Sequence, residues 1–156
     1  MESSEAVPRI LLDTSFLLPT LGISVSGITP EAISNLAEAQ TGIYYSRFSI
    51  LESLWVAART IKDGTSDGES FRLGLRSIME GGRYARVEED SEIFSEAFKL
   101  HTLGHKDMID NILYASAARL GLLLLTVDDD LKKFVLEKQL KRSFISLDEL
   151  ALLAKR

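Results

Sequence analysis

The sequence predicts an α/β fold in which a parallel sheet lies between layers of helices. Segments with strand character alternate with segments with helix character along the chain, which is the order found in parallel sheets. The strand segments are apolar almost throughout, residues 122–127 most clearly, as in strands buried on both faces. The length of 156 residues suits one compact domain with a substantial core. We expect residues 1–8 to form a flexible N-terminal tail and residues 9–156 to form a single domain.

Five apolar runs are expected to form the strands of this sheet. Each run is short, rich in aliphatic or aromatic residues, and followed by polar or small residues. In chain order they cover residues 9–12, 43–45, 85–87, 122–127 and 143–146. Because helical segments separate consecutive runs, the strands should be parallel, with all their carboxyl ends at one edge of the sheet.

The helices are delimited by cap residues and glycines. Thr29, Pro30 and Glu31 combine a cap, a proline in the first turn and an acid near the positive end of the helix dipole. Gly121 is suited to end the helix before it. The stretch before Thr29, which contains Pro19, Gly22 and Gly27, is expected to be a turn region. The expected helices cover about residues 29–40, 46–61, 69–79, 90–103, 106–120, 128–140 and 146 onward.

The composition excludes several classes of protein. With 18 Lys and Arg against 23 Asp and Glu, the formal charge is −5, which argues against a purely electrostatic binder of nucleic acid. The chain has no cysteine, so disulfides, thiolate metal sites and thiol nucleophiles are excluded. The start lacks the features of a signal peptide, and the apolar runs are too short to span a bilayer. We expect a cytoplasmic protein with no membrane partner.

Two acids directly follow predicted strands. Asp13 comes after the first strand, and Asp128 comes after residues 122–127. Both should therefore lie at the carboxyl edge of the sheet, where oxygen donors are available to a hard divalent ion. The simpler interpretation is that each acid caps the helix that follows it.

Glu52 is the only charged residue in the apolar run of residues 48–58. Its neighbours, including Leu54 and Trp55, have the character of core residues. An ionised carboxylate in such surroundings is costly unless it is paired or bound to a cation. The alternative is a capping box, because Ser49 and Glu52 have the spacing of that motif.

Asp107 and Asp110 lie three residues apart near the start of the helix over residues 106–120, so both point to roughly one side. First-turn acids are favoured by the helix dipole in any case. Asp110 also shares a face with apolar residues that should pack on the sheet. We therefore expect Asp110 to face inward and Asp107 to lie at the rim.

Together these acids predict one cluster at the sheet edge. Its members come from separate elements and are Asp13, Glu52, Asp110 and Asp128, with Asp107 and Asp130 nearby. Converging carboxylates repel one another unless a cation neutralises them. Mg²⁺ or Mn²⁺ would do so, and such an ion generates hydroxide from water and stabilises charge on a phosphodiester.

The motifs that carry these acids occur in a set order between about residues 9 and 146. They are an apolar strand ending in Asp13, an apolar helix with Glu52, Asp110 followed by small residues up to residue 117, and a strand leading to Thr-x-Asp-x-Asp at residues 126–130. As an ordered set they resemble the PIN-domain family, which includes the VapC-type toxin ribonucleases. Leu131 stands where the family often has an aromatic residue.

The resemblance implies a three-layer α/β/α sandwich with a central parallel sheet of about five strands. It also implies a Mg²⁺- or Mn²⁺-dependent endoribonuclease, a hydrolase of RNA, with Asp13, Glu52, Asp110 and Asp128 as the acids that bind the metal and carry out catalysis. The further residues implied in supporting roles are Ser15, Thr126, Asp130 and, without a settled role, Asp107. A toxin of this family would have an antitoxin partner and would form a homodimer.

Other functions remain as alternatives. A phosphatase of the haloacid-dehalogenase type needs a second acid two residues after Asp13, where this chain has Ser15. A phospho-receiver needs an acid pair after the first strand and a lysine after the last, and the chain has neither. A catalytically silent PIN-like scaffold, or an RNA-processing or RNA-binding module, is the remaining alternative.

Basic and aromatic residues give weaker indications of function. Residues 59–86 contain four acids and six basic residues, one of which is Arg59. These could form a phosphate-binding rim, although a solvated helix face is the more ordinary interpretation. Tyr44, Tyr45 and Trp55 are expected in the core rather than as platforms for stacking bases.

Overall fold

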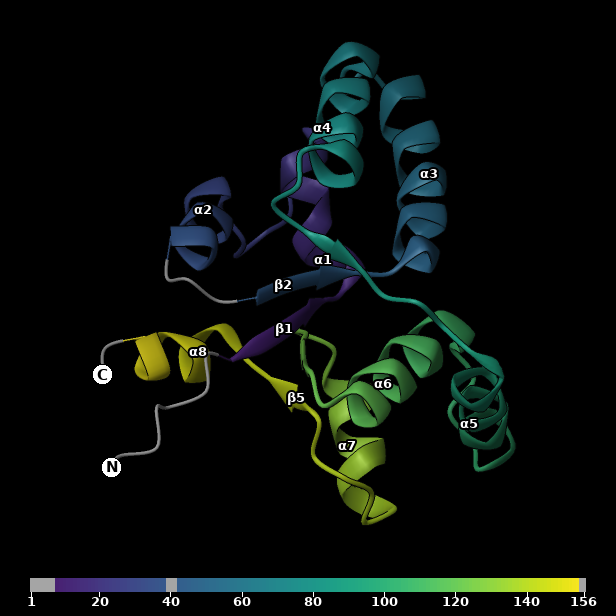
Figure 1. The fold of residues 1–156 in the computed structure, drawn as a ribbon. Coiled ribbons are helices and arrows are strands. Elements are labelled where there is room, and N and C mark those ends of the chain that lie inside the picture. Colours follow the sequence, from purple (N-terminus) through teal and green to yellow (C-terminus); the bar gives the residue numbers. More distant parts are fainter. Residues whose placement is uncertain (1–7, 39–41, 155–156) are drawn as a thin grey trace.

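The computed structural model describes residues 8–38 and 42–154, so the expected tail at residues 1–8 lies almost wholly outside the described residues. Five parallel strands form one sheet in the order β3-β2-β1-β4-β5, which confirms the expected sheet (Figure 1). The strands are β1 (Arg9–Leu12), β2 (Gly42–Tyr45), β3 (Ala85–Arg86), β4 (Leu123–Leu125) and β5 (Phe144–Ile145). The strand order reverses between β1 and β4. Ligands of open α/β sheets bind outside the carboxyl ends of the strands at such a reversal.

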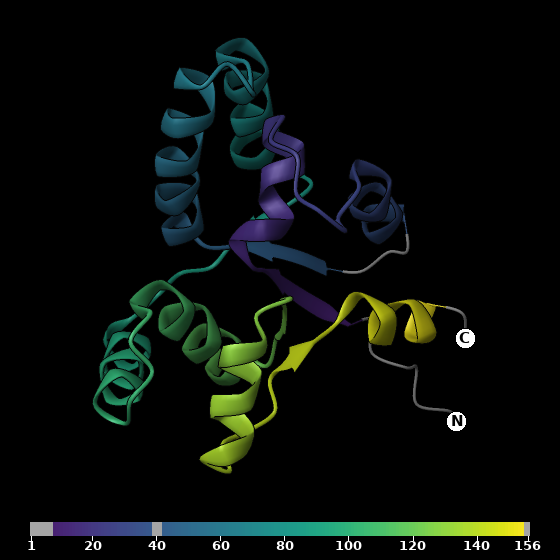
Figure 2. The same ribbon diagram turned by 180° about the vertical axis from the view of Figure 1, so that it is seen from behind.

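Helices cover both faces of the sheet and complete the expected three-layer α/β/α sandwich (Figures 1 and 2). One layer holds α1, the 3₁₀ helix η1, α2, α3, α4 and α8, and the other holds α5, α6 and α7. The helices are α1 (Thr14–Leu17), η1 (Leu18–Leu21), α2 (Pro30–Glu38), α3 (Arg47–Lys62), α4 (Gly68–Glu80), α5 (Ser91–Thr102), α6 (Met108–Leu120), α7 (Asp129–Glu137) and α8 (Leu147–Ala154).

The central strand shows why the strand segments are apolar throughout. Ile10, Leu11 and Leu12 are all fully buried. Ile10 and Leu12 belong to the core under the first layer of helices, whereas Leu11 belongs to the core under the second. Because successive side chains of a strand point to opposite faces, a strand covered on both sides needs apolar residues at every position.

The prediction of a turn region around Pro19 and Gly22 is wrong, because this stretch contains a short helix. The chain enters α1 directly after Asp13 and continues into η1, with Pro19 in the first turn of η1 and Gly22 as its left-handed C-terminal cap. Proline and glycine here delimit a short helix, as their positions permit. α4 packs against η1 at Gly74, where a Cβ atom would collide with the carbonyl oxygen of Thr20.

The expectation that Trp55 and Leu54 belong to the core is also wrong. Trp55 is 57% exposed and Leu54 is 44% exposed, whereas Tyr45 is buried and Tyr44 is half-buried. α3 and α4 project away from the sheet as a pair (Figures 1 and 2), so only one side of α3 faces the core. Every helix in the described ranges is too short or too polar to cross a bilayer.

Candidate active site

A pocket of about 490 Å³ opens beside the carboxyl ends of β1 and β4. Six of its lining residues are charged, five acids and one arginine. The acids come from four separate parts of the fold. The lining residues are Asp13, Thr14, Ser15, Leu18, Glu52, Trp55, Val56, Arg59, Asp107, Asp110, Val127 and Asp128. The structure therefore brings the four acids of the expected cluster to one pocket, together with Asp107 and Ser15.

Asp13 lies at the end of β1 and is buried, with 7% of its surface exposed. One carboxylate oxygen accepts a hydrogen bond from the Thr14 backbone N–H at 2.7 Å, which caps α1. The other accepts one from the Thr126 hydroxyl at 2.7 Å. Burial raises the pKa of Asp13 to about 6, although both hydrogen bonds favour the ionised form and act in the opposite direction. The cap interpretation and the pocket position both hold for this residue.

Asp128 is the N-cap residue of α7, and like Asp13 it forms a hydrogen bond with Thr126. β4 ends at Leu125, earlier than expected, so the next three residues form the turn into α7. The Asp128 backbone N–H donates to the Thr126 hydroxyl oxygen at 3.0 Å, and the Asp128 carboxylate caps α7 by accepting from the Leu131 N–H at 3.1 Å. Thr126 is fully buried and holds both acids at fixed positions.

Asp110 is the most strongly perturbed acid of the pocket. It is 8% exposed, and its pKa is raised to about 9, first by burial, then by a hydrogen bond with Asp128 and by the charges of Asp13 and Asp107. The same hydrogen bond lowers the pKa of Asp128. Asp107 is exposed and caps α6, where its carboxylate accepts from the Asp110 backbone N–H at 3.1 Å.

Glu52 lies in the second turn of α3 and is half-buried. The capping box considered for it is absent, because Ser46 and not Ser49 caps the helix. Its carboxylate has no hydrogen bond or ion pair with any residue in the described ranges. The negative charge of Glu52 contributes to the raised pKa of Asp13, which places the two acids within electrostatic range of each other.

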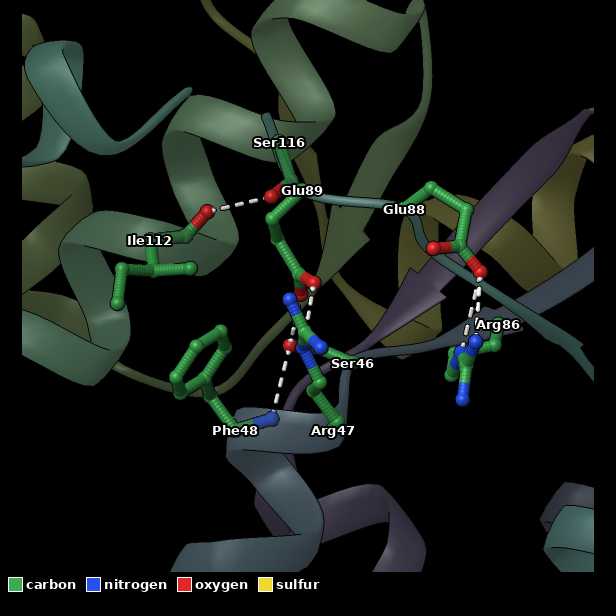
Figure 3. Close-up of polar contacts among 8 residues, drawn as sticks. All are labelled: Ser46, Arg47, Phe48, Arg86, Glu88, Glu89, Ile112 and Ser116. Carbon is green, nitrogen blue, oxygen red and sulfur yellow. Dashed lines mark hydrogen bonds and ion pairs between the residues drawn. The ribbon is translucent and has the colours of Figure 1, made fainter. Parts of the chain in front are cut away.

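Asp130 was expected near the acid cluster but lies away from the pocket, and a buried acid, Glu89, was not expected. Asp130 is exposed in the first turn of α7 and does not line the pocket. Glu89, which sequence reasoning missed, has a fully buried side chain that accepts a hydrogen bond from the Ser46 hydroxyl at 2.7 Å (Figure 3). Arg47 Nε lies 3.2 Å from the other Glu89 oxygen, without the alignment of a hydrogen bond.

Glu89 thus anchors the start of the helix that carries Glu52. The Ser46 hydroxyl oxygen accepts a hydrogen bond from the Phe48 N–H at 3.1 Å while it donates to Glu89. The only sequence signal was an acid shortly after a short strand, the same signal that singled out Asp13. Its neighbour Glu88 is exposed and pairs with Arg86 at 2.9 Å, so the two adjacent glutamates have different environments (Figure 3).

The donor chemistry of the pocket suits a hard divalent cation, which prefers carboxylate oxygens. The raised pKa values of Asp13 and Asp110 are the expected result of crowding and burying acids without a neutralising charge. As the side chains stand, no three His, Asp or Glu residues in the described ranges are grouped closely enough to hold a metal ion. The donor types therefore fit a cation, whereas the side chains are not arranged in advance to coordinate one.

Solved structures share this fold at low sequence identity. A chain of VapBC2 from Rickettsia felis, solved with a DNA fragment from the promoter, matches with a TM-score of 0.62 at 14% identity, covering 88% of this chain and 98% of that one. A toxin–antitoxin complex from Klebsiella pneumoniae matches at 0.51 and 19%, covering 77% and 87%. FitAcB from Neisseria gonorrhoeae matches at 0.50 and 17%, covering 77% and 88%. A comparison with curated protein sequences finds no significant match.

A family model identifies the fold more specifically. The model described as PIN domain matches residues 10–135, which is most of the chain and includes all the acids of the pocket. PIN domains are typically nucleases and generally use divalent metal ions. The match over this length, on a five-stranded parallel sheet with acids gathered at its carboxyl edge, shows that the chain belongs to the PIN domain family.

Proposed function

We propose that this PIN domain is a metal-dependent endoribonuclease that hydrolyses RNA phosphodiester bonds. The observation that carries the proposal is the meeting of Asp13, Glu52, Asp110 and Asp128 around one pocket at the reversal of strand order. No nucleophilic side chain is needed for hydrolysis by an activated water molecule. We propose that the protein is located in the cytoplasm, because its proposed substrate, RNA, is found there.

The four acids would hold Mg²⁺ or Mn²⁺. When bound, the ion supplies an activated water molecule and neutralises charge on the phosphodiester. Asp110 holds a proton on its carboxyl group at neutral pH, because its pKa is about 9, and must release it to act as a ligand. Thr126 fixes the carboxylate of Asp13 in one orientation through its 2.7 Å hydrogen bond. Glu52 has carboxylate oxygens without protein partners among the described residues, free to bind the ion or to accept a proton from water.

The test is cleavage of a mixed RNA pool by the wild-type protein and by Asp110→Asn, with the fragment ends sequenced. We expect the wild type to cleave only with added Mg²⁺ or Mn²⁺ and Asp110→Asn to be inactive. Asp129→Asn is a matched control, because Asp129 is exposed and does not line the pocket. Unchanged, metal-supported cleavage by Asp110→Asn would refute the proposal.

We further propose that the protein is the toxin of a toxin–antitoxin pair and forms a homodimer. The structural neighbour from Klebsiella pneumoniae is a toxin–antitoxin complex by its title, and this supports the proposal. Expression should then arrest growth, and a small protein encoded beside it should restore growth and co-purify with it. Light scattering of the purified protein should give the mass of a dimer. Normal growth on expression of active protein would contradict the toxin assignment.

A catalytically silent scaffold or RNA-binding module is the second candidate. It is favoured by one observation, the lack of a ready-made metal-binding group of side chains in the described ranges. Titration calorimetry separates the two candidates, because a silent scaffold would bind neither Mg²⁺ nor Mn²⁺.

A further inference from the structure

The face of α3 that lines the pocket carries an acid, an aromatic residue and a cation in sequence. Glu52, Trp55 and Arg59 follow one another at helical spacings of three and four, so they lie on one side of the helix. All three line the pocket. Seven residues of helix rise by about 10 Å, so Arg59 lies well out along α3 from Glu52.

Trp55 lines the pocket and exposes a large apolar surface. It is 57% exposed, although burying an indole is normally favourable. Leu51 and Leu54 on the same helix are also exposed but do not line the pocket. Trp55 therefore gives the pocket a flat aromatic wall that is accessible from solvent.

Arg59 is the only basic residue that lines this acidic pocket. Its guanidinium is exposed and has no ion pair with any residue in the described ranges, whereas Arg47, Arg72 and Arg86 each pair with a glutamate. A guanidinium is suited to bind phosphate, because its fixed N–H groups match two phosphate oxygens.

We infer that this face of α3 binds the RNA strand next to the cleaved bond, with an unpaired base stacked on Trp55 and a backbone phosphate bound by Arg59. The inference rests on the proposed nuclease function and assigns it two substrate-binding residues. Aromatic side chains stack on unpaired bases of any sequence, and arginine adds the phosphate contact. A base inside a duplex is already stacked on both sides, so Trp55 would select single-stranded segments. A protein partner is the competing occupant of this face. RNA is favoured because Trp55 and Arg59 line the same pocket as the acids proposed to cleave it.

Trp55 is the only tryptophan of the chain, so its fluorescence reports directly on stacking. The experiment titrates full-length Asp110→Asn, which binds without cleaving, with a single-stranded RNA of mixed sequence about 12 nucleotides long, in Mg²⁺. The same RNA annealed to its complement is titrated in parallel. We expect single-stranded RNA to quench the fluorescence and the duplex to have little effect. Equal quenching by both, or none by either, would overturn the inference.

Variants then separate the two contacts by anisotropy of labelled RNA. Trp55→Ala should raise Kd by about 5- to 100-fold and Trp55→Phe by much less, since phenylalanine can still stack. Arg59→Ala should weaken binding and reduce the salt dependence by about one charge, and Arg59→Lys should restore that dependence. The matched controls are Leu54→Ala and Arg83→Ala, which are exposed and outside the pocket and should bind as the parent does.

The outcomes distinguish this inference from the proposed function. If the wild type cleaves RNA but Trp55→Ala and Arg59→Ala bind RNA unchanged, the inference is wrong and the nuclease function stands. If Trp55 is quenched and its variants weaken binding while the wild type never cleaves, the RNA site stands and the nuclease function is wrong. If Trp55→Ala and Leu54→Ala abolish self-association and neither affects RNA binding, the face is a protein interface.

Discussion

The Thr126 hydroxyl donates a hydrogen bond of 2.7 Å to the carboxylate of Asp13, which lies 113 positions earlier in the chain. The same hydroxyl oxygen accepts the Asp128 backbone N–H at 3.0 Å. One buried side chain thus couples the end of β1 to the start of α7 at the reversal of strand order.

Thr126→Val should weaken metal binding in a manner that depends on pH. The hydrogen bond from Thr126 lowers the pKa of Asp13, so its loss should raise that pKa and let protons compete better with the metal. We expect weaker Mn²⁺ binding at neutral pH and recovery at alkaline pH, with a loss of about 1–3 kcal/mol in the free energy of unfolding. Thr126→Ser keeps the hydroxyl and is the control. Equal Mn²⁺ affinities of the two variants at neutral pH would contradict this role.

In chelator, the stability of the protein should fall as the pH rises. The pKa of Asp13 is raised to about 6 and that of Asp110 to about 9, from the ordinary value of 3.8. Both carboxyls therefore bind protons more tightly in the folded chain, so the free energy of unfolding decreases from about pH 4 towards pH 9. Asp128, whose pKa is lowered, contributes the opposite dependence only at more acidic pH.

Thermal unfolding in chelator at several pH values measures this dependence. Asp110→Asn should show a smaller decrease than the wild type, because it lacks the ionisation with the higher pKa. Added Mg²⁺ or Mn²⁺ should raise the transition temperature most at alkaline pH, where the acids are ionised. A wild-type protein that gains stability in chelator between pH 5 and pH 8 would contradict these pKa shifts.

Asp110→Asn should separate stability from activity. At neutral pH the Asp110 carboxyl is protonated in the metal-free protein, and an asparagine has nearly the same shape and charge. We expect the free energy of unfolding in chelator to change by less than about 1 kcal/mol, while metal-dependent cleavage falls by at least about 100-fold. A variant that unfolds in chelator would show that the ionised carboxylate supports the fold.

Glu89→Ala should destabilise the protein, whereas Glu88→Ala should not. The Glu89 side chain is fully buried and accepts a hydrogen bond from the Ser46 hydroxyl at 2.7 Å, whereas the Glu88 side chain is 75% exposed. Loss of a buried charged acceptor is expected to cost about 1.5–3 kcal/mol, and loss of a surface ion pair less than about 1 kcal/mol. Urea unfolding of the two variants measures the difference, and equal losses would show that the buried contact does not stabilise α3.

Gly74→Ala should destabilise the packing of α4 on η1. A Cβ atom at Gly74 collides with the backbone of Thr20, which cannot move without shifting η1. We expect a loss of about 1–3 kcal/mol or more. Gly68→Ala, at the first residue of α4, meets no atom closer than 4.0 Å and should be neutral or stabilising by up to about 1 kcal/mol. Urea unfolding of both variants tests the assignment, which fails if Gly74→Ala is as stable as the wild type.

Local sequence signals predicted the sheet and most helices. A continuous apolar run identifies a strand buried on both faces, and caps such as Gly121, which is left-handed in the structure, mark helix ends. The short helix after Asp13 was missed because Pro19 and Gly22 suit a turn as well as the ends of a short helix. These ambiguities are settled by what the segment packs against.

Residues whose environment depends on tertiary structure could not be placed from sequence. Trp55 has the apolar neighbours of a core residue, and its exposure follows only from the projection of α3 away from the sheet. Glu89 is distinguished from Glu88 only by its contact with Ser46, 43 positions earlier. Asp13 and Asp128 were found because strand ends in a parallel sheet share an edge, whatever their separation in sequence. Glu52 and Asp110 were found because each is an acid among the apolar residues of a predicted helix.

Titration calorimetry of the wild type and Asp110→Asn with Mn²⁺ tests the central claim, that the carboxylates of this pocket bind a divalent cation. The titrations are repeated in buffers of different ionisation enthalpy, so that proton release is measured with binding. We expect the wild type to bind Mn²⁺ and to release protons, and Asp110→Asn to bind at least about tenfold more weakly and to release fewer. A wild-type protein that binds no Mn²⁺, or an Asp110→Asn protein that binds as tightly with the same proton release, would contradict the account.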